Sequence, residues 1–438
     1  MPPLPAPGLP RSLPPIGAGI RRWAGRLAAR WVRRRGLDLS RLTFLPAGAR
    51  TPLERIGPDP VPRLAELRAA GPVHRLPLPF DLPVHLVTGS AAARTVLADR
   101  DGFSNDIRHL LGGPGAATAD QIGGLGFTDD PLHTRLRTLV APEFTRHRLQ
   151  RLEPVIDGIV ARRLDALEVA GSPADLARLV SSPVPLETIC SVLGLEQPDQ
   201  ETFARLGSRR FDATGGAAAA FGAVSDQRRL LLDAVAGQRW APGPGLIGQI
   251  IRTEGDRISD ADLAGLADGI VTGGYETTAA MISLGTVVLL RDPAAAALVR
   301  NGSSEDVDRV VEELLRHLSV VQVAFPRFAR RDMDLLGRRL RAGDAVLASL
   351  SAANRDPASA GEHPDRFDPG RSPVRGHLAF GHGVHRCVGA ELARMELRTV
   401  LPALFGRFPD LALAVPPERL RYRRLSFVHG VEELPVTV

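Results

Sequence analysis

One long stretch limits what this chain can fold into. Residues 260–290 carry the strongest helix pattern, and Pro293 marks its end. Ser259 and Asp262 stand at the spacing of an N-terminal capping box. A helix of this length measures on the order of 45 Å, enough to cross a whole domain. Its most apolar run, residues 277–290, is shorter than the ~18–20 residues of a membrane span, which favours a core helix.

The segments around this helix predict a mainly α chain with a small β-rich part. Further helices are expected after Ser304, in EELLRHL, and after Cys387, in ELARMELRTVLPALF. The Ala- and Gly-rich residues 211–245 predict helices joined by mobile loops. Short strands are expected in a hairpin at residues 73–89, in MDLLGRRL, in AVLASLS and near the C-terminus. Residues 59–438 therefore form one predicted globular unit.

Composition narrows the class of protein. The formal net charge is +6, but arginine accompanies abundant Ala, Gly and Pro, so the basic balance is a weak sign of nucleic-acid binding. Aromatic residues make up 5%, too few for stacking on single strands, and no nucleic-acid partner is expected. Two cysteines cannot form a disulfide framework, which favours a reducing cytoplasm.

Residues 1–58 are interpreted as an N-terminal extension. The segment is Pro-rich up to Pro15 and then basic, with apolar side chains at helical spacing: Ile20, Trp23, Leu27 and Trp31. The pattern favours an extra helix packed on the body, or a frayed arm. A basic amphipathic helix that contacts a membrane or a partner is the alternative. The continuous apolar stretch of a secretory signal is missing.

Cys387 lies in a segment that is unusual for a core thiol, FGHGVHRCVG at residues 380–389. A thiolate is a strong, soft metal ligand, and glycines let a backbone approach a flat cofactor. A zinc site from His382, His385 and Cys387 would lack a second Cys or His group at ligand spacing. A cysteine nucleophile and a buried thiol in a tight turn both remain open.

The segment resembles the haem-thiolate signature of the cytochrome P450 family, F-G-x-G-x-H/R-x-C-x-G, at every fixed position. The resemblance implies a cytochrome P450 fold around haem b, with Cys387 as the proximal iron ligand. Phe380, Gly381 and Gly389 belong to the same signature, whose glycines would expose backbone N–H groups to the sulfur. His385 is expected to donate to a haem propionate.

TGGYETT, in the middle of the long helix, resembles the family motif A/G-G-x-D/E-T-T. Two adjacent glycines cost roughly 1 kcal/mol each inside a helix, and close packing of helices is one explanation for them. The resemblance implies instead that the helix opens locally at Gly273 and Gly274, beside the haem. Glu276 and Thr277 would then form an acid–alcohol pair that relays protons during oxygen activation.

Three further segments resemble family motifs in the family's order. DDPLHTRLR places His133 and Arg137 on one helix face, and VAFPRFARRD supplies Arg327. The resemblance implies that these three side chains donate to haem propionates. EELLR supplies Glu313 and Arg316, a pair that would brace the cysteine loop through the coil containing NRDP and FDPGR.

The resemblance as a whole implies a bacterial-type monooxygenase that inserts one oxygen atom of O2 into an apolar small molecule. Electrons would come from a ferredoxin and its reductase, docked near Arg386 and Arg135. Oxidative coupling on a carrier-bound or natural-product substrate, a peroxygenase and a non-catalytic haem-binding module are the alternatives. Expected pocket segments, including residues 105–126 and 321–325, are mostly apolar or small, which does not identify the substrate.

Overall fold

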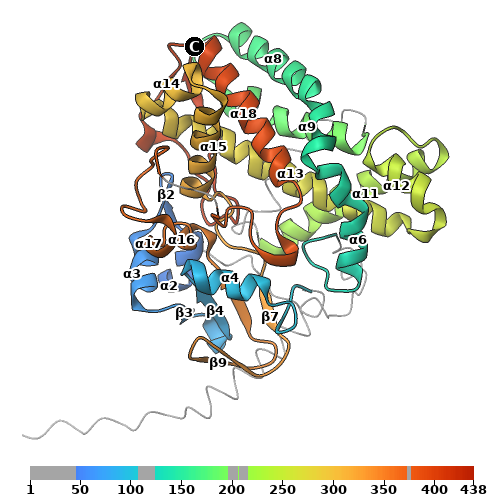
Figure 1. Cartoon of the computed structure of the whole chain (residues 1–438), viewed down its shortest axis with the longest axis vertical. Helices are drawn as coiled ribbons and strands as arrows, with labels where there is room; N and C mark the ends of the chain where they lie inside the picture. The colour runs from blue at the N-terminus through green and yellow to red at the C-terminus, as the bar shows by residue number, and fades with distance from the viewer. Residues whose placement is uncertain (1–45, 107–123, 196–205, 207–215, 372–375) are drawn as a thin grey trace, which may run out of the picture.

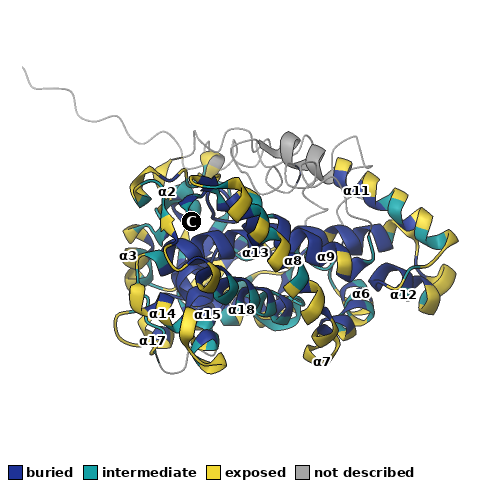
Figure 2. Ribbon diagram, turned by 90° about the horizontal axis from the view of Figure 1, so that it is seen from above, coloured by how far each residue is buried: buried dark blue, intermediate teal, exposed yellow. Residues whose placement is uncertain are grey.

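The computed structural model describes residues 46–106, 124–195, 206, 216–371 and 376–438. Its longest helix, α13 (Asp260–Leu290), runs through the middle of the molecule and is mostly buried (Figures 1 and 2). The Asp262 amide donates to the Ser259 side chain over 3.0 Å, which caps the first turn. The predicted long helix and its N-terminal cap are therefore confirmed.

The helices that pack on α13 include α9 (Pro183–Leu193), α11 (Gly216–Trp240), α15 (Ser304–Leu318) and α18 (Ala390–Arg407). One large apolar core fills the space between them. Residues 216–240 form the single helix α11. The prediction of several helices within residues 211–245 is therefore wrong for this described part. The other helices are α2 (Ala47–Arg50), α3 (Pro62–Ala70), α4 (Ser90–Ala98), α6 (Leu132–Val140), α7 (Arg146–Leu149), α8 (Glu153–Ala170), α12 (Leu246–Glu254), α14 (Pro293–Asn301), α16 (Leu350–Ala353) and α17 (Pro357–Ala360).

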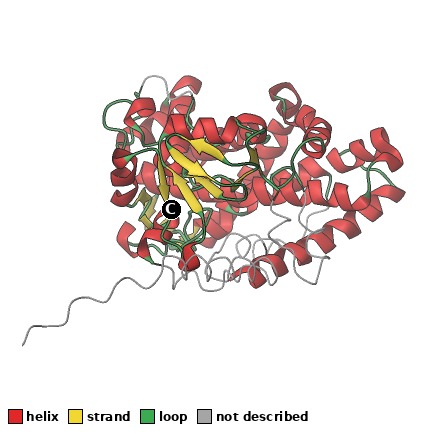
Figure 3. Cartoon of the chain, turned by 90° about the horizontal axis from the view of Figure 1, so that it is seen from below, coloured by secondary structure: helices red, strands yellow, loops and turns green. Residues whose placement is uncertain are grey.

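A small β-rich part lies beside the helices (Figure 3). Its largest sheet has the order β3 (Val73–Arg75), β4 (Val84–Val87), β10 (Ala345–Ala348), β7 (Arg327–Ala329) and β5 (Phe103–Ser104). The expected hairpin is the antiparallel β3–β4 pair, whereas β10 joins β4 in parallel. The remaining strands are β1 (Arg55–Ile56) with β2 (Asp59–Pro60), β8 (Met333–Leu335) with β9 (Arg338–Leu340), and β11 (Ala412–Leu413) with β12 (Pro435–Thr437) and β6 (Ala174–Asp175).

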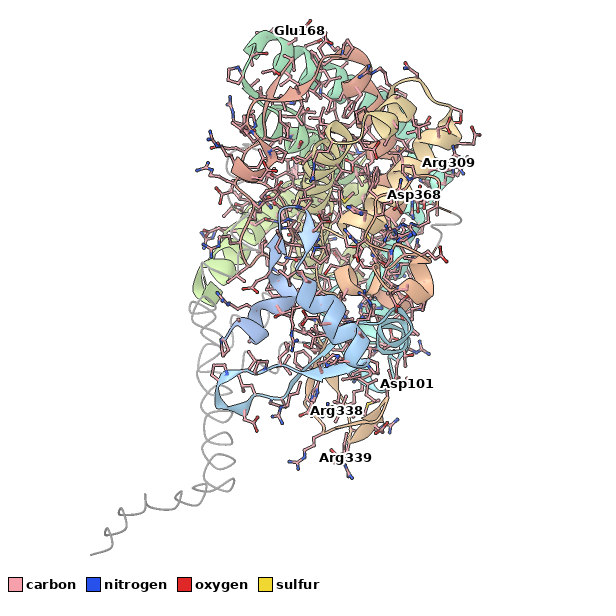
Figure 4. The ribbon with its side chains drawn as sticks, turned by 90° about the vertical axis from the view of Figure 1, so that its left-hand side faces the viewer. Asp101, Glu168, Arg309, Arg338, Arg339 and Asp368 are labelled. Carbon is pink, nitrogen blue, oxygen red and sulfur yellow. The ribbon has the colours of Figure 1, made fainter. Side chains whose placement is uncertain are left out.

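MDLLGRRL forms the two-stranded β8–β9 hairpin instead of one strand. Leu336 and Gly337 turn the chain with positive φ angles of 52° and 82°. Arg338 and Arg339 extend outward from this hairpin (Figure 4). Mainly α with a small β part is thus the observed fold class.

Residues 46–58, the described part of the predicted extension, are tied to the end of α15. Arg55 donates to the carbonyls of Leu318 and Ser319 and to Gln322 Oε1. Burial lowers the pKa of Arg55 to about 9. The predicted amphipathic helix between residues 20 and 35 lies outside the described residues.

None of the described helices is long and apolar enough to span a bilayer by itself. Only the pair α13 and α14, taken together, has the length and composition of a membrane span, and the two helices are bent by 117° relative to each other.

Candidate functional site

The cysteine loop, residues 380–389, is held by hydrogen bonds within its own backbone. The Cys387 amide donates to the Phe380 carbonyl over 2.9 Å, which closes the loop. Gly381 and Gly383 have φ angles of +70° and +72°. A Cβ on Gly383 would also come within 2.5 Å of the Leu97 carbonyl oxygen in α4, so only glycine fits there.

The thiol of Cys387 is accessible although protein atoms surround it. The residue is classed as exposed, yet burial raises the pKa of its thiol above the ordinary value. The Gly389 amide and the guanidinium groups of Arg386 and Arg137 act in the opposite direction. Residue 387 is thus exposed, while a backbone donor and positive charge lie near its sulfur and are available to a thiolate.

Arg137 lies on the same side as the cysteine loop. Its Nη2 donates to the Arg386 carbonyl over 2.8 Å. Burial lowers the pKa of Arg137, whereas the nearby Cys387 raises it. Arg137 therefore lies beside the loop that carries Cys387.

The predicted Glu313–Arg316 pair is buried on α15 and holds the coil that precedes the loop. Two hydrogen bonds of 2.7 Å join the guanidinium to the carboxylate. The remaining Arg316 donors reach three coil carbonyls, those of Asn354, Pro364 and Arg366. The Asn354 side chain in turn accepts from the Leu378 amide over 2.6 Å, two residues before the loop. The predicted brace is therefore confirmed.

His133, Arg327 and His385 line one cavity of about 530 Å³. The two imidazole rings have centroids 4.0 Å apart, and His133 Nε2 is buried without a hydrogen-bond partner among the described residues. Arg327 is 4% exposed and donates to the Phe325 carbonyl, but it forms no ion pair within the described part of the chain. Burial lowers the pKa of Arg327 to about 10 and that of His385 to about 4. Asp99, Asp101, Asp129 and Asp130 line the same cavity. An anion placed beside Arg327 and His133 Nε2 would give both groups a partner, whereas His385 Nδ1 already faces the Leu125 carbonyl over 3.1 Å.

The two glycines in the middle of α13 have different surroundings. A Cβ on Gly274 would lie 2.9 Å from Ile189 Cδ1 in α9, so Gly274 permits close helix packing. A Cβ on Gly273 would meet no atom of the described residues within 4 Å. Gly273 and Thr277, one turn apart, are accessible within an otherwise buried stretch of helix. This face of α13 therefore opens on free space.

The expected local opening of this helix is wrong. α13 is a continuous α-helix through residues 273–277, and the Thr277 hydroxyl donates to the Gly273 carbonyl over 2.6 Å. Glu276 points elsewhere, because consecutive helical residues lie about 100° apart. Its carboxylate is buried and accepts from Arg423 Nη1 over 2.5 Å. The structure thus places Glu276 and Thr277 side by side in the chain but on different faces of the helix.

Comparisons with known proteins identify the family. A family model described as Cytochrome P450 matches residues 246–412. Cytochrome P450 165B3 of Amycolatopsis orientalis is 39% identical over 392 residues, which cover 88% of this chain and 97% of the relative. The chain belongs to the cytochrome P450 family. Cytochrome P450 monooxygenase PikC of Streptomyces venezuelae is 38% identical over 382 residues, 86% of this chain and 91% of PikC.

A solved structure confirms the cytochrome P450 fold. OxyC, described as a cytochrome P450 implicated in an oxidative C–C coupling reaction during vancomycin biosynthesis, matches with a TM-score of 0.78. The two chains are 38% identical, and the match covers 90% of this chain and 97% of OxyC. The fold predicted from the motifs is therefore correct.

Cytochromes P450 bind haem b through a cysteine thiolate, and the residues of this P450 fit that group. Haem carries two propionates, which are the anions that the cavity of His133, Arg327 and His385 would accept. The accessible sulfur of Cys387 and the free space beside Gly273 suit an iron ligand and a flat ring. The zinc alternative has no support among the described residues, where no three His, Cys, Asp or Glu side chains are grouped to hold a metal.

Sequence reasoning missed the side chains that hold the predicted ones in place. Arg423 pairs with Glu276 across 147 residues, and no motif spacing signals it. Arg394 of α18 lies 4.6 Å from the centroid of the Phe380 ring and binds Glu312. The doubled glutamate in EELLR is the one local sign that α15 supplies a second functional carboxylate.

Proposed function

We propose that this cytochrome P450 monooxygenase binds the haem iron through the Cys387 thiolate and oxidises an apolar small molecule. The observation that carries the proposal is the setting of Cys387, an exposed residue whose thiol has the Gly389 amide and the guanidinium groups of Arg386 and Arg137 near it. When bound, haem supplies the activation of O2 by two external electrons, with one oxygen atom entering the substrate and the other leaving as water.

His133, Arg327 and His385 are the proposed propionate ligands of this chain. All three line the same cavity, where His133 Nε2 has no hydrogen-bond partner and the buried Arg327 forms no ion pair among the described residues. His385 Nδ1 faces the Leu125 carbonyl, so His385 donates from Nε2 only when its ring is protonated. Arg137 is proposed to act nearer the cysteine, because its guanidinium already holds the Arg386 carbonyl. Gly381 and Gly389 shape the loop, Phe380 closes it, and Gly273 keeps space beside the ring.

Thr277 and Glu276 are the proposed proton-delivering residues. The Thr277 hydroxyl is on the accessible face of α13, where it can donate to a small molecule in the free space beside Gly273. Glu276 lies on a different face of α13, where its carboxyl group accepts from Arg423 Nη1. A proton reaches Thr277 from Glu276 only through intervening water, because the two side chains face different directions.

A ferredoxin with its reductase is the proposed electron source. Arg386 of the cysteine loop is exposed and acts on the Cys387 thiol, so positive charge lies close to the sulfur. Arg135 of α6 is also exposed, two residues before Arg137, whose guanidinium binds the Arg386 carbonyl. An acidic electron carrier would be attracted to this surface, and its association rate would fall as ionic strength rises.

The test of the iron ligand is a pair of cysteine substitutions. Cys387→Ser should abolish the red-shifted Soret band of the reduced CO complex, whereas Cys190→Ala should leave it unchanged. Cys190 is the matched control because it is buried in α9, and burial raises the pKa of its thiol to about 12. A Cys387→Ser protein that kept the band and full turnover would refute the proposal.

Oxidative coupling of a natural-product substrate is the second candidate function. It is favoured by OxyC, which matches over most of both chains, whereas PikC is equally similar and is named only as a monooxygenase. The product of labelled O2 separates the two: hydroxylation adds one labelled oxygen atom, while coupling removes two hydrogen atoms and adds none. The pocket loop that would contribute to this choice, residues 107–123, lies outside the described residues.

A further inference from the structure

A cluster between α15 and α18 reaches the cysteine loop without belonging to the family motifs discussed above. Arg394 donates to both oxygens of Glu312, through Nε to Oε1 and through Nη2 to Oε2 over 3.1 Å. His377 Nε2 lies 3.2 Å from the same Oε2. The Ala379 amide donates to His377 Nδ1 over 3.2 Å, so the ring proton is on Nε2, which donates to Glu312.

The cluster is a fixed ion pair and not a loose surface contact. Burial raises the pKa of Glu312, but hydrogen bonds from His377 and Arg394 outweigh it and lower the value to about 2. The Arg394 and Glu312 side chains are only 12% and 19% exposed. Two charge-assisted bonds between a guanidinium fork and one carboxylate define a single geometry.

Arg394 and His377 each connect Glu312 to the loop. The Arg394 guanidinium stacks 4.6 Å from the centroid of the Phe380 ring, a cation–π contact. Phe380 is the residue whose carbonyl accepts the Cys387 amide. His377 precedes Phe380 by three residues and is fixed at both ring nitrogens. The chain is therefore held at His377, three residues before the loop, and at Phe380, whose carbonyl closes the loop.

We propose that Glu312, His377 and Arg394 form a clamp that positions the cysteine loop through Phe380 and keeps Cys387 where it would bind the haem iron. The inference rests on the proposed role of Cys387. These are positioning residues, and their task differs from that of the neighbouring Glu313, which acts on the preceding coil through Arg316. Adjacent glutamates on α15 thus support two successive segments of the chain.

The experiment compares Arg394→Met and Arg394→Lys with the wild type, as haem-loaded full-length proteins. The readout is the rate at which the red-shifted Soret band of the reduced CO complex is lost on mild warming, with haem content and far-UV circular dichroism measured alongside. Arg394→Met should lose the band about tenfold faster, because Phe380 loses its cation–π partner and Glu312 loses the two bonds that fix it beside His377. Arg394→Lys keeps the charge without the planar fork and should fall between the two.

Arg398→Met is the matched control. Arg398 lies one turn further along α18 and pairs with Asp308, also on α15, so it joins the same two helices away from the loop. It should change the rate by no more than about twofold. Equal acceleration by Arg394→Met and Arg398→Met would overturn the proposal, because the effect would then be a general loosening of the helix pair.

Two further variants keep the outcome interpretable. Glu312→Gln removes the carboxylate charge that His377 and Arg394 share, so it should accelerate loss of the band as Arg394→Met does. It therefore tests the clamp even if Arg394→Met fails to fold. A wild-type rate in either variant would overturn the clamp. Cys387→Ser separates the clamp from the proposal on which it rests. Loss of the band in Cys387→Ser with a wild-type rate in Arg394→Met refutes the clamp alone, whereas an unchanged band in Cys387→Ser refutes the iron ligand itself.

Discussion

The hydroxyl of Thr277 is one atom on which the proposed reaction depends. It donates to the Gly273 carbonyl and faces accessible space. We predict that Thr277→Ala consumes reductant at a comparable rate but diverts much of it to hydrogen peroxide, because electron uptake and O2 binding need no proton whereas productive oxygen activation does. Reductant consumed, peroxide released and product formed should be measured together with a true substrate and a reconstituted redox chain.

Thr286→Ala is the control for this prediction. Thr286 lies on the same helix, and its hydroxyl makes the same type of bond, to the Ile282 carbonyl over 2.8 Å. Its loss should leave the ratio of peroxide to product unchanged. Full coupling in Thr277→Ala would mean that protons arrive by another path.

Glu396, on α18, gives the protein a dependence on pH that is unrelated to the reaction. Burial raises the pKa of its carboxyl from 4.5 to about 8, against the lowering effect of the Thr188 and Thr278 hydroxyls. Between these two values the folded protein holds a proton that the unfolded chain releases, so the free energy of unfolding falls as pH rises and levels off above about 8. The side chain of Glu396→Gln cannot ionise. The free energy of unfolding of this variant should therefore fall by roughly 2–4 kcal/mol less than that of the wild type over the same pH range.

Urea unfolding near the two ends of that pH window measures the difference. Glu168→Gln is the control, because Glu168 is an exposed partner of Arg407 at the far end of the molecule (Figure 4). It should retain the wild-type pH dependence. An identical pH dependence in Glu396→Gln and the wild type would show that the buried carboxyl does not cause it.

At the scale of elements, the contact of α9 with α13 depends on one missing methyl group. Gly274→Ala gains about 1 kcal/mol of helix propensity, but its Cβ would lie 2.9 Å from Ile189 Cδ1. We predict that overpacking outweighs the gain and that Ile189→Val, which removes that atom, restores stability in the double variant. Thermal unfolding of both single variants and the double variant tests this coupling, and strict additivity would contradict it.

Gly273→Ala is the neighbouring comparison. Its Cβ meets open space, so the same substitution should stabilise the helix by up to about 1 kcal/mol. It should nevertheless weaken haem or substrate binding, because the methyl group enters the free space of the site. Unchanged ligand affinities would show that the space beside Gly273 is not used.

The elements show why local patterns predicted some features and not others. Glu313 with Arg316 and the glycines around Cys387 are encoded within a few residues, so the resemblance to short family motifs was enough to locate them. The helix opening expected at TGGYETT was wrong, because the Thr277 side chain takes the Gly273 carbonyl without breaking α13. Arg423 and Arg394 act on residues 147 and 82 positions away, and only the folded chain brings such pairs together.

At the scale of the whole molecule, residues 46–58 of the predicted N-terminal extension are packed on the body through Arg55. We predict that removing residues 1–45 leaves the ratio of haem to protein intact. Removing residues 1–58 should destabilise the fold by roughly 3 kcal/mol or more, because the buried carbonyls of Leu318 and Ser319 lose the Arg55 donors. Haem content and urea midpoints distinguish the two truncations. A haem-free product of the shorter deletion would place the extension in the core.

The ion pair of Arg423 with Glu276 also sets an order of assembly during synthesis. Every motif from His133 to Cys387 has left the ribosome before Arg423 emerges, and the Arg423 amide can donate to the Gly430 carbonyl only after that later residue has emerged too. Until then Glu276 is a carboxylate on a core helix without its guanidinium, a costly arrangement once the helix is buried. A messenger RNA truncated before the codon of Arg423 would therefore encode all the signature residues and still yield a protein whose central helix α13 is destabilised at Glu276.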